Sequence, residues 1–304
     1  MEELYLTYAK QMREKYGEKV YKLPVNLPAT CPNRDGVKGS GGCIFCGAKG
    51  TGFENLSNTL TVKEQLEINK NYIGPKYKAK LFVAYFQNFT NTYFPVELMY
   101  DYTKQAAETE GIVELCFATR PDCVEKEILD AIKAAANGKQ VCIEFGLQSV
   151  NETTLLKINR GHTVQEYIEA VKRVQAYGFS VGTHLILNLP WDLREDCIDA
   201  AKLVSELNID TVKTHTLYIE KGTELCRMYQ AGEIEICSIE EYILRAADFL
   251  EHLKPGISVQ RLASRVPNSD TVFCNWGRGW WKLRDMIEEE MRSRNSIQGI
   301  KWKE

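Results

Sequence analysis

The sequence of 304 residues lacks long apolar segments and has almost no charge imbalance. No uninterrupted apolar run approaches the roughly 20 residues that a helix needs to cross a bilayer. The first 20 residues carry charges throughout and contain no apolar core of signal-peptide length. The net charge of −3 excludes a global basic field, so nucleic acid would need a local patch. We therefore expect a cytoplasmic protein with neither membrane nor DNA as a partner.

Histidine is scarce, and no second CxxC pair or HxxxH pair follows the single CxxC at a zinc-finger distance. Cysteine, in contrast, occurs ten times, although the reducing cytoplasm disfavours structural disulfides. Three cysteines cluster in the segment CPNRDGVKGSGGCIFC, residues 31–46. Others stand singly among apolar or helical residues, where we expect buried, unreactive thiols and no second ligand set: Cys116, Cys142, Cys197, Cys226 and Cys237.

Short runs rich in Val, Ile, Leu, Phe and Tyr alternate with amphipathic stretches along most of the chain. Nearly continuous apolar runs are typical of parallel strands that are covered on both faces. The expected strands are 20–27, 80–87, 112–119, 141–147, 180–187 and 210–219. Clear helical patterns lie at 163–178, 193–208 and 238–254, and Thr163 and Gly178 suit the two ends of the first.

After a long first connection, strand starts recur about every 29 to 39 residues, which is the span of a βα unit. Six such units fit before Pro255, and no repeat or low-complexity linker interrupts them. We predict an α/β fold, a partial (β/α)6 barrel of the TIM type, with a doubly wound open sheet as the alternative. In either fold the chemistry belongs at the carboxyl ends of the strands.

The predicted division places the core barrel and its N-terminal segment in residues 1–254. Residues 255–304 would form a short C-terminal α/β extension that packs on the barrel. Within it the pattern predicts a strand at 257–263 and a helix at 284–294.

The cysteine segment follows the first expected strand and is rich in glycine, which lets the backbone approach a bound group closely. Thiolates are soft ligands for zinc, Cu(I) or iron–sulfur clusters. Three cysteines on a [4Fe–4S] cluster would leave one iron open to a cofactor or substrate. The alternative is a structural zinc site whose fourth ligand lies elsewhere, such as His162 or another cysteine. The position at the catalytic rim and the absence of a second ligand pair favour the cluster.

The pattern Cys31-x11-Cys43-x2-Cys46 resembles that of radical S-adenosylmethionine (SAM) enzymes, and specifically the stand-alone Elongator-like, YhcC-type group with its CPNRDG opening. Further motifs extend the resemblance over most of the chain: YFQNFTNTY (85–93), ATRPD (118–122), EFGLQS (144–149), NRGH (159–162), HLILNLP (184–190) and IQG (297–299). The resemblance implies a barrel of the radical SAM kind, with the three cysteines as ligands of a [4Fe–4S] cluster. It also implies reductive cleavage of SAM to a 5′-deoxyadenosyl radical, which abstracts hydrogen from a substrate. A one-electron donor such as flavodoxin or ferredoxin is implied as a partner.

The same resemblance assigns cofactor contacts to single positions. Phe45 matches the residue whose backbone lies along the adenine, and Gln148 matches one that reaches the ribose hydroxyls. Arg160 matches a residue that pairs with the cofactor carboxylate, for which a surface salt bridge is the alternative. His184 occupies a ribose-contacting position often held by an acid, and a core histidine is the equal alternative.

Some positions depart from the family pattern. A glycine-rich turn after the second strand is replaced by QNFT, residues 87–90, where Gln87 and Thr90 are candidate substitutes. An expected Gly-Glu after the fifth strand is Trp-Asp here, so Asp192 is a doubtful replacement. Arg120 and Asp122 either meet the substrate or pair with each other, and we favour pairing. No catalytic residue is assigned.

The resemblance to Elongator suggests a tRNA nucleoside as the substrate, and a small metabolite stays open as the alternative. The segment NWGRGWWKLR (275–284) interleaves tryptophans with cations, as proteins that bind single-stranded RNA do; alternatively, the tryptophans close the open side of the barrel. Cys123 and Cys274 are candidate thiols at the barrel mouth, although incidental cysteines are the favoured interpretation. The alternative function is a non-enzymatic iron–sulfur or zinc-binding sensor or interaction module.

Overall fold

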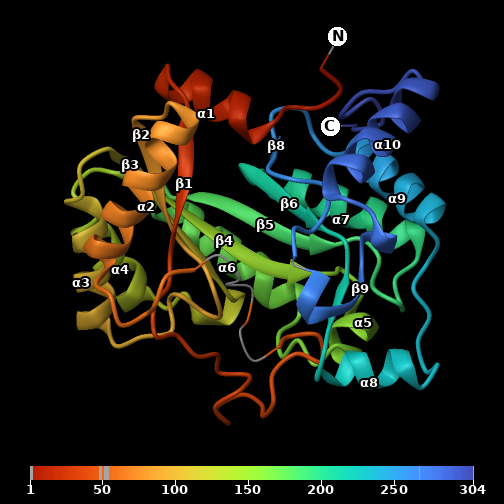
Figure 1. Cartoon of the computed structure of the whole chain (residues 1–304), viewed down its shortest axis with the longest axis horizontal. Coiled ribbons are helices and arrows are strands. Elements are labelled where there is room, and N and C mark those ends of the chain that lie inside the picture. Colours follow the sequence, from red (N-terminus) through yellow and green to blue (C-terminus); the bar gives the residue numbers. More distant parts are fainter. Residues whose placement is uncertain (1–2, 48–49, 51–54, 267, 304) are drawn as a thin grey trace.

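The computed structural model describes residues 3–47, 50, 55–266 and 268–303 (Figure 1). Its main sheet is parallel throughout, and neighbouring strands follow one another in the order β1-β2-β3-β4-β5-β6-β8. The strands are β1 Val20–Val25, β2 Leu81–Phe86, β3 Ile112–Thr119, β4 Gln140–Gln148, β5 Ser180–Ile186, β6 Thr211–His215 and β8 Ser258–Val259. β7 Tyr218–Glu220 and β9 Thr271–Cys274 form a separate antiparallel pair.

Helices follow most strands and cover the outer side of the curled sheet (Figure 1). They are α1 Tyr8–Tyr16, α2 Val62–Tyr77, α3 Val96–Ala107, α4 Lys126–Ala135, α5 Glu152–Lys157, α6 Val164–Ala176, α7 Arg194–Glu206, α8 Glu224–Gln230, α9 Ile239–His252 and α10 Trp280–Ser293. Among the helices that the structure describes, none has the length and apolar character that crossing a bilayer requires.

The strand order confirms the partial barrel and excludes the doubly wound alternative. A doubly wound sheet reverses direction in the middle of its strand order, whereas here β1 to β6 are neighbours in sequence order. Five of the six predicted strands are found with ends within two residues of the prediction.

The predicted strand 210–219 is wrong as a single element. It divides into β6, in the barrel, and β7, which pairs with β9. The division has a local cause, because the backbone N–H of Leu217 donates to the side-chain Oδ1 of Asn188 at 2.6 Å rather than to a neighbouring strand.

Local capping explains the best-predicted helix. The Thr163 hydroxyl accepts from the Glu166 N–H at 3.1 Å, and the Glu166 carboxylate accepts from the Thr163 N–H at 2.7 Å. Gly178 follows the helix with a φ of 73°, a conformation that costs glycine little. Both predicted ends of α6 are therefore confirmed.

The two faces of the barrel strands differ in chemistry. Outward side chains such as Leu115, Phe117, Ile143, Phe145 and Val181 are fully buried in the core between the sheet and the helices. Inward side chains at alternating positions are polar or charged, and they include Lys22, Glu144, His184 and Lys213. Burial of the outer layer stabilises the fold, and the interior is left for chemistry.

The C-terminal residues contribute to the barrel itself. The predicted strand 257–263 is reduced to β8, which pairs with β6, and the predicted helix 284–294 begins four residues earlier as α10. Gln298 and Gly299 of the IQG motif connect the two ends of the chain, since the Gln298 side chain accepts from the Leu6 N–H and Gly299 donates to the Leu250 carbonyl. The division at residue 254 stays a prediction.

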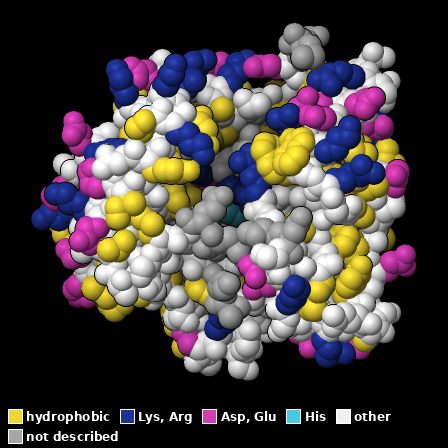
Figure 2. All heavy atoms as spheres, in the orientation of Figure 1, with side chains coloured by type: hydrophobic (Ala, Val, Ile, Leu, Met, Phe, Trp, Pro, Cys, Tyr) yellow, Lys and Arg dark blue, Asp and Glu magenta, His cyan; other side chains and the backbone are white. Residues whose placement is uncertain are grey.

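Figure 2 shows one face of the molecule, in the orientation of Figure 1. Near its middle the surface is hollowed, and Lys and Arg side chains lie beside a histidine there.

Candidate active site

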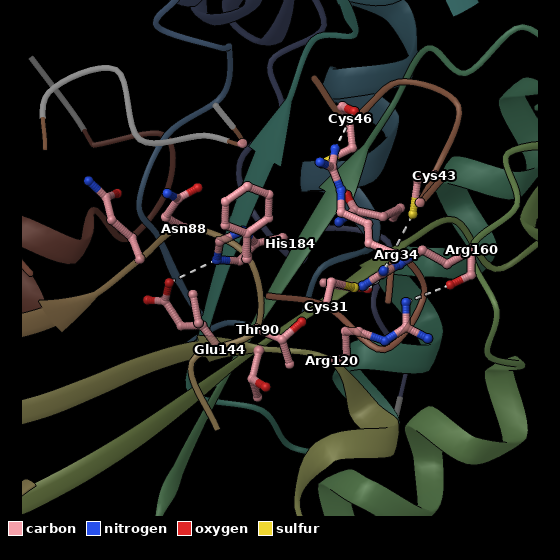
Figure 3. A pocket seen from close by; sticks show the side chains of 18 of the residues that line it. Cys31, Arg34, Cys43, Cys46, Asn88, Thr90, Arg120, Glu144, Arg160 and His184 are labelled. Carbon is pink, nitrogen blue, oxygen red and sulfur yellow. Dashed lines mark hydrogen bonds and ion pairs between the residues drawn. The ribbon is translucent and has the colours of Figure 1, made fainter. Parts of the chain in front are cut away.

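A cavity of about 140 Å³ lies where the cysteine loop meets the ends of strands β2 to β5 (Figure 3). Every residue that the sequence assigned to a metal or cofactor lines it: Cys31, Cys43, Phe45, Cys46, Gln87, Thr90, Gln148, Arg160 and His184. Residues far apart in the chain therefore converge on one pocket, which we call the cofactor pocket.

The cysteine loop is fixed by the rest of the protein. The Ile44 N–H donates to the Ile158 carbonyl at 3.1 Å, and the Ile44 carbonyl accepts from the Leu225 N–H at 2.9 Å. The Asn159 side chain also donates to the Gly42 carbonyl at 2.9 Å. These bonds hold the loop in place through protein groups alone.

The donor set of the cysteine loop consists of three thiolates, which are the soft ligands that iron–sulfur clusters take. Within the described residues, Cys116, Cys142 and Glu144 are the group whose potential ligand atoms lie within 4.8 Å of one another, and no loop cysteine belongs to it. Zinc at about 2.3 Å from each thiolate requires sulfurs only about 3.8 Å apart. Three cysteines that line one pocket are the donor set of a cluster that leaves one iron without a protein ligand.

His162 does not act as the fourth ligand that the zinc alternative needs. Its Nε2 lies 3.2 Å from the Gly146 carbonyl oxygen, and its Nδ1 lies 3.2 Å from the Thr163 carbonyl oxygen. Burial lowers the pKa of this imidazole to about 3. Because both ring nitrogens face backbone carbonyls, the zinc alternative with His162 as a ligand is wrong.

Arg160 is buried beside the cysteines and meets no carboxylate within 4.0 Å among the residues described. Its Nε and Nη2 donate to the Gly146 carbonyl at 3.1 and 2.6 Å, and Nη1 lies 3.7 Å from the Cys43 sulfur (Figure 3). A guanidinium has five N–H donors, so two remain, one on each terminal nitrogen. The surface salt bridge considered for Arg160 is therefore wrong, and the free pair of donors suits a carboxylate.

Gln148 lies at an irregularity in the pairing of β4 with β5. The register of the pairing shifts between Gly146 and Gln148. Gln148 has a φ of 75°, which is rare for a residue other than glycine. A Cβ added to Gly146 would lie 2.7 Å from Gln148 Nε2 and 2.8 Å from Arg160 Nη2. Glycine at 146 thus leaves the space in which these two side chains meet.

The turn after β2 keeps a glycine-like backbone without glycine. Asn88 and Phe89 have φ values of 91° and 54°. Asn88 Oδ1 is buried in the pocket lining and has no hydrogen-bond partner among the described residues. Gln87, one of the two predicted substitutes, instead donates to Asn55 at 2.8 Å, and Thr90 donates its backbone N–H to Thr30. Asn88 was not predicted as a site residue, although asparagine in place of an expected glycine signals such a conformation.

His184 contacts a buried carboxylate. Its Nε2 lies 2.8 Å from Glu144 Oε2 (Figure 3), and burial lowers the pKa of His184 to about 4, so the ring is neutral near pH 7. Although burial alone would raise it, the pKa of Glu144 is held well below its ordinary value by Lys213 and Lys22. Glu144 also lines the pocket and was not predicted as a site residue.

The remaining predicted rim residues have structural partners. Arg120 and Asp122 pair through two hydrogen bonds of 2.8 and 3.0 Å, as predicted, and Arg120 also lines the pocket. Asp192 is buried, accepts from the Ser149 hydroxyl at 3.0 Å and is not among the lining residues. Cys123 is buried and likewise absent from the lining.

The tryptophans of the segment 275–284 lie in different surroundings. Trp276 packs against Tyr242 with ring centroids 5.3 Å apart. Trp280 lines a second cavity of about 240 Å³ at the side of the barrel, where the Arg265 guanidinium lies 3.7 Å from the centre of its ring. Trp281 is 56% exposed. We call this second space the side cavity.

Two family models match the chain. The model of the radical SAM superfamily covers residues 30–219, and the model of a radical SAM C-terminal domain covers residues 209–293. Protein YhcC of Escherichia coli is 31% identical over 98% of this chain and 96% of its own length.

More distant matches are also found. The tRNA uridine(34) acetyltransferase of Methanocaldococcus jannaschii is 34% identical over 43% of this chain and 24% of its own length. Among solved structures, the archaeal Elp3 of Methanocaldococcus infernus superposes with a TM-score of 0.69 at 18% identity, covering 92% of this chain and 64% of that one. This likeness concerns the fold.

Proposed function

The chain belongs to the radical SAM superfamily, and from that premise we propose that the cofactor pocket holds a [4Fe–4S] cluster and SAM for hydrogen abstraction from a nucleoside in RNA. The protein is a radical SAM enzyme, and these two groups are the cofactors of its family. When bound, they supply a 5′-deoxyadenosyl radical from the reductive cleavage of SAM. The chain's own residues hold, orient and enclose the two groups.

Arg160 carries the cofactor part of the proposal. Its two unused N–H donors lie next to Cys43, which is a proposed cluster ligand with Cys31 and Cys46. They would bind the carboxylate of SAM at the iron that lacks a protein ligand. A buried guanidinium without an acidic partner is costly unless an anion binds to it, and the cofactor provides that anion.

Other lining residues would bind the rest of SAM. Asn88 Oδ1, buried and without a partner among the described residues, would accept from the amino group. Gln148 would reach the ribose hydroxyls, and the backbone of Phe45 would lie along the adenine. His184 donates toward Glu144 through Nε2, which leaves Nδ1 for a ribose hydroxyl.

Anaerobic reconstitution with iron and sulfide tests this proposal. We expect a brown protein with about four irons per chain that forms 5′-deoxyadenosine after reduction in the presence of SAM. A colourless protein with one tightly bound zinc would overturn the proposal and favour the interaction module.

RNA as the substrate is the finer part of the proposal. It is supported by the partial match to a protein named for tRNA uridine(34), and by Trp280 beside Arg265 at the side cavity, because aromatic rings and cations together bind unpaired bases. Fold likeness alone does not transfer a substrate.

Retention of tRNA tests that part directly. Replacement of Arg278, Lys282 and Arg284 by Gln should lower tRNA affinity at least tenfold at low salt, while Lys202→Gln on the exposed surface of α7 should not. Failure of the unchanged protein to retain tRNA even at low salt would contradict an RNA substrate.

Two further elements complete the proposal. We propose the cytoplasm as the place of work, because all ten cysteines are free thiols, as reducing conditions favour. A small one-electron donor such as flavodoxin or ferredoxin would reduce the cluster.

A further inference from the structure

Three cations and one carboxylate meet on the inner face of the barrel, beside the cofactor pocket. The cations are Lys22 on β1, Lys213 on β6 and Arg261 just after β8, and the carboxylate is Glu144 on β4. His184 and His215 lie among them with ring centroids 5.4 Å apart. Burial lowers the pKa of both rings below the ordinary value, so neither adds charge near pH 7. The group therefore carries an excess of two positive charges.

Glu144 has no capacity left for a third cation. Its Oε1 accepts from Lys22 at 2.5 Å and from Gln260 at 2.6 Å. Its Oε2 accepts from Lys213 at 2.9 Å and lies 2.8 Å from His184 Nε2. Lys213 also donates to the Tyr85 hydroxyl at 2.7 Å. The single negative charge of Glu144 is therefore shared between Lys22 and Lys213, and Arg261 is left unmatched.

Arg261 has no carboxylate within 4.0 Å in the part of the chain that the structure describes. Its Nη2 donates to His215 Nδ1 at 2.8 Å, and its Nε is buried without a hydrogen-bond partner among the described residues. The backbone is well held, because the Arg261 carbonyl accepts from both the N–H and the hydroxyl of Thr214 at 3.1 Å. A firmly positioned guanidinium with an open edge is costly unless an anion binds to it.

Arg261 is reachable from the side cavity. Arg261 and Gln260 line that cavity together with Trp280, whereas Glu144 and His184 line the cofactor pocket. The hydrogen bond between Gln260 and Glu144 therefore lies at the boundary between the two spaces. A group bound to Arg261 from the side cavity would therefore lie on the far side of this contact from the cofactor pocket.

We propose that Arg261 binds a phosphate group of the substrate. A phosphate in RNA is a diester that carries one negative charge, which matches the charge of Arg261, and its free oxygens suit the edge of a guanidinium. The inference deepens the proposed function and rests on it, because it names the chemical class of group that the substrate presents beside SAM.

Thermal unfolding and calorimetry of the full chain test the inference. Inorganic phosphate should raise the melting temperature of the unchanged protein, whereas chloride at equal ionic strength should not. Arg261→Met should raise the melting temperature without phosphate, because an uncompensated buried charge is removed, and should weaken phosphate binding at least tenfold. The exposed Arg13→Met is the matched control and should change neither quantity.

Absence of phosphate binding to the unchanged protein, or equal binding by Arg261→Met, would overturn the inference. Should the methionine variant fail to fold, Arg261→Lys retains the charge without the fork and is expected to bind phosphate at least tenfold more weakly; an unchanged affinity would refute the assignment. Two compounds distinguish the source of the phosphate. Tighter binding of uridine 5′-monophosphate than of ribose 5-phosphate supports a nucleotide, and equal binding supports a sugar phosphate.

The two proposals fail separately. Formation of 5′-deoxyadenosine by the reconstituted enzyme reports on the cofactor pocket and does not require phosphate. If 5′-deoxyadenosine forms but phosphate does not bind, only the anion site is wrong. If phosphate binds but no 5′-deoxyadenosine forms, only the proposed function is wrong.

Discussion

The contact between Arg160 and the carboxylate of SAM can be isolated by changing both partners. Arg160→Met removes the guanidinium but keeps a side chain of similar length. The Gly146 carbonyl does not lose every partner, because His162 Nε2 remains 3.2 Å away. On the ligand side, decarboxylated SAM lacks only the group that Arg160 is expected to bind.

The expected magnitude follows from the two N–H donors that Arg160 leaves unused. Hydrogen bonds to a charged group contribute about 1.5–3 kcal/mol each in protein interiors, and the two bonds of one fork are not independent. We therefore expect a coupling free energy of about 3 kcal/mol, or roughly 150-fold in affinity. The iron would also contribute to binding of the carboxylate. This contribution cancels in the comparison because it is the same in the unchanged protein and in Arg160→Met.

The assay is anaerobic equilibrium dialysis of the two ligands against cluster-loaded protein, with the iron content of each variant measured first. Removal of the carboxylate should weaken binding to the unchanged protein by roughly 150-fold more than binding to Arg160→Met. The exposed Arg173→Met serves as the control and should discriminate between the ligands as the unchanged protein does. If Arg160→Met discriminates equally well, Arg160 does not bind the carboxylate.

Three further predictions concern the cluster and the fold. Cys43→Ser should lower iron and visible absorbance to well below one cluster per chain, whereas Cys237→Ser should not; equal iron in both would exclude Cys43 as a ligand. Burial raises the pKa of Asp192 from 3.8 to about 6, so the native state binds this proton more tightly than the unfolded state does, and stability contributed by the group is lost as pH rises from 4 to 6. Between pH 4 and 6 the free energy of unfolding, measured in urea, should fall by about 3 kcal/mol less for Asp192→Asn than for the unchanged protein. An equal pH dependence of the two proteins would contradict the raised pKa of Asp192. Tyr167→Phe removes a buried hydrogen bond of 2.6 Å to the Thr183 hydroxyl and should lower the free energy of unfolding by about 1–2 kcal/mol, which an unchanged urea midpoint would refute.

The sequence predicted the barrel well because its signals are local. Each strand is a short apolar run, and the ends of α6 are marked by Thr163 and Gly178 within the same segment. The site residues that belong to short motifs, such as Arg160 and Gln148, were also predicted to meet, and the structure brings them into one pocket. Their roles stay proposals until ligands are measured.

The inner-face charges were not predicted, because no local pattern marks them. Glu144 lies between aromatic and aliphatic neighbours, and its partner Lys22 is 122 positions away in the sequence. Arg261 was placed in a predicted strand of the C-terminal extension, although its side chain belongs to the barrel interior. Charge pairing across a barrel depends on strand order and register, which are tertiary properties.

The anchoring of the cysteine loop has a consequence for how the enzyme survives air. Ile44 and Gly42 are hydrogen-bonded to Ile158, Leu225 and Asn159, so the loop keeps its shape without iron. Small zinc domains, in contrast, unfold when their metal is removed. We expect oxygen damage here to leave an intact, empty scaffold, ready for repair by fresh iron and sulfide rather than destined for degradation.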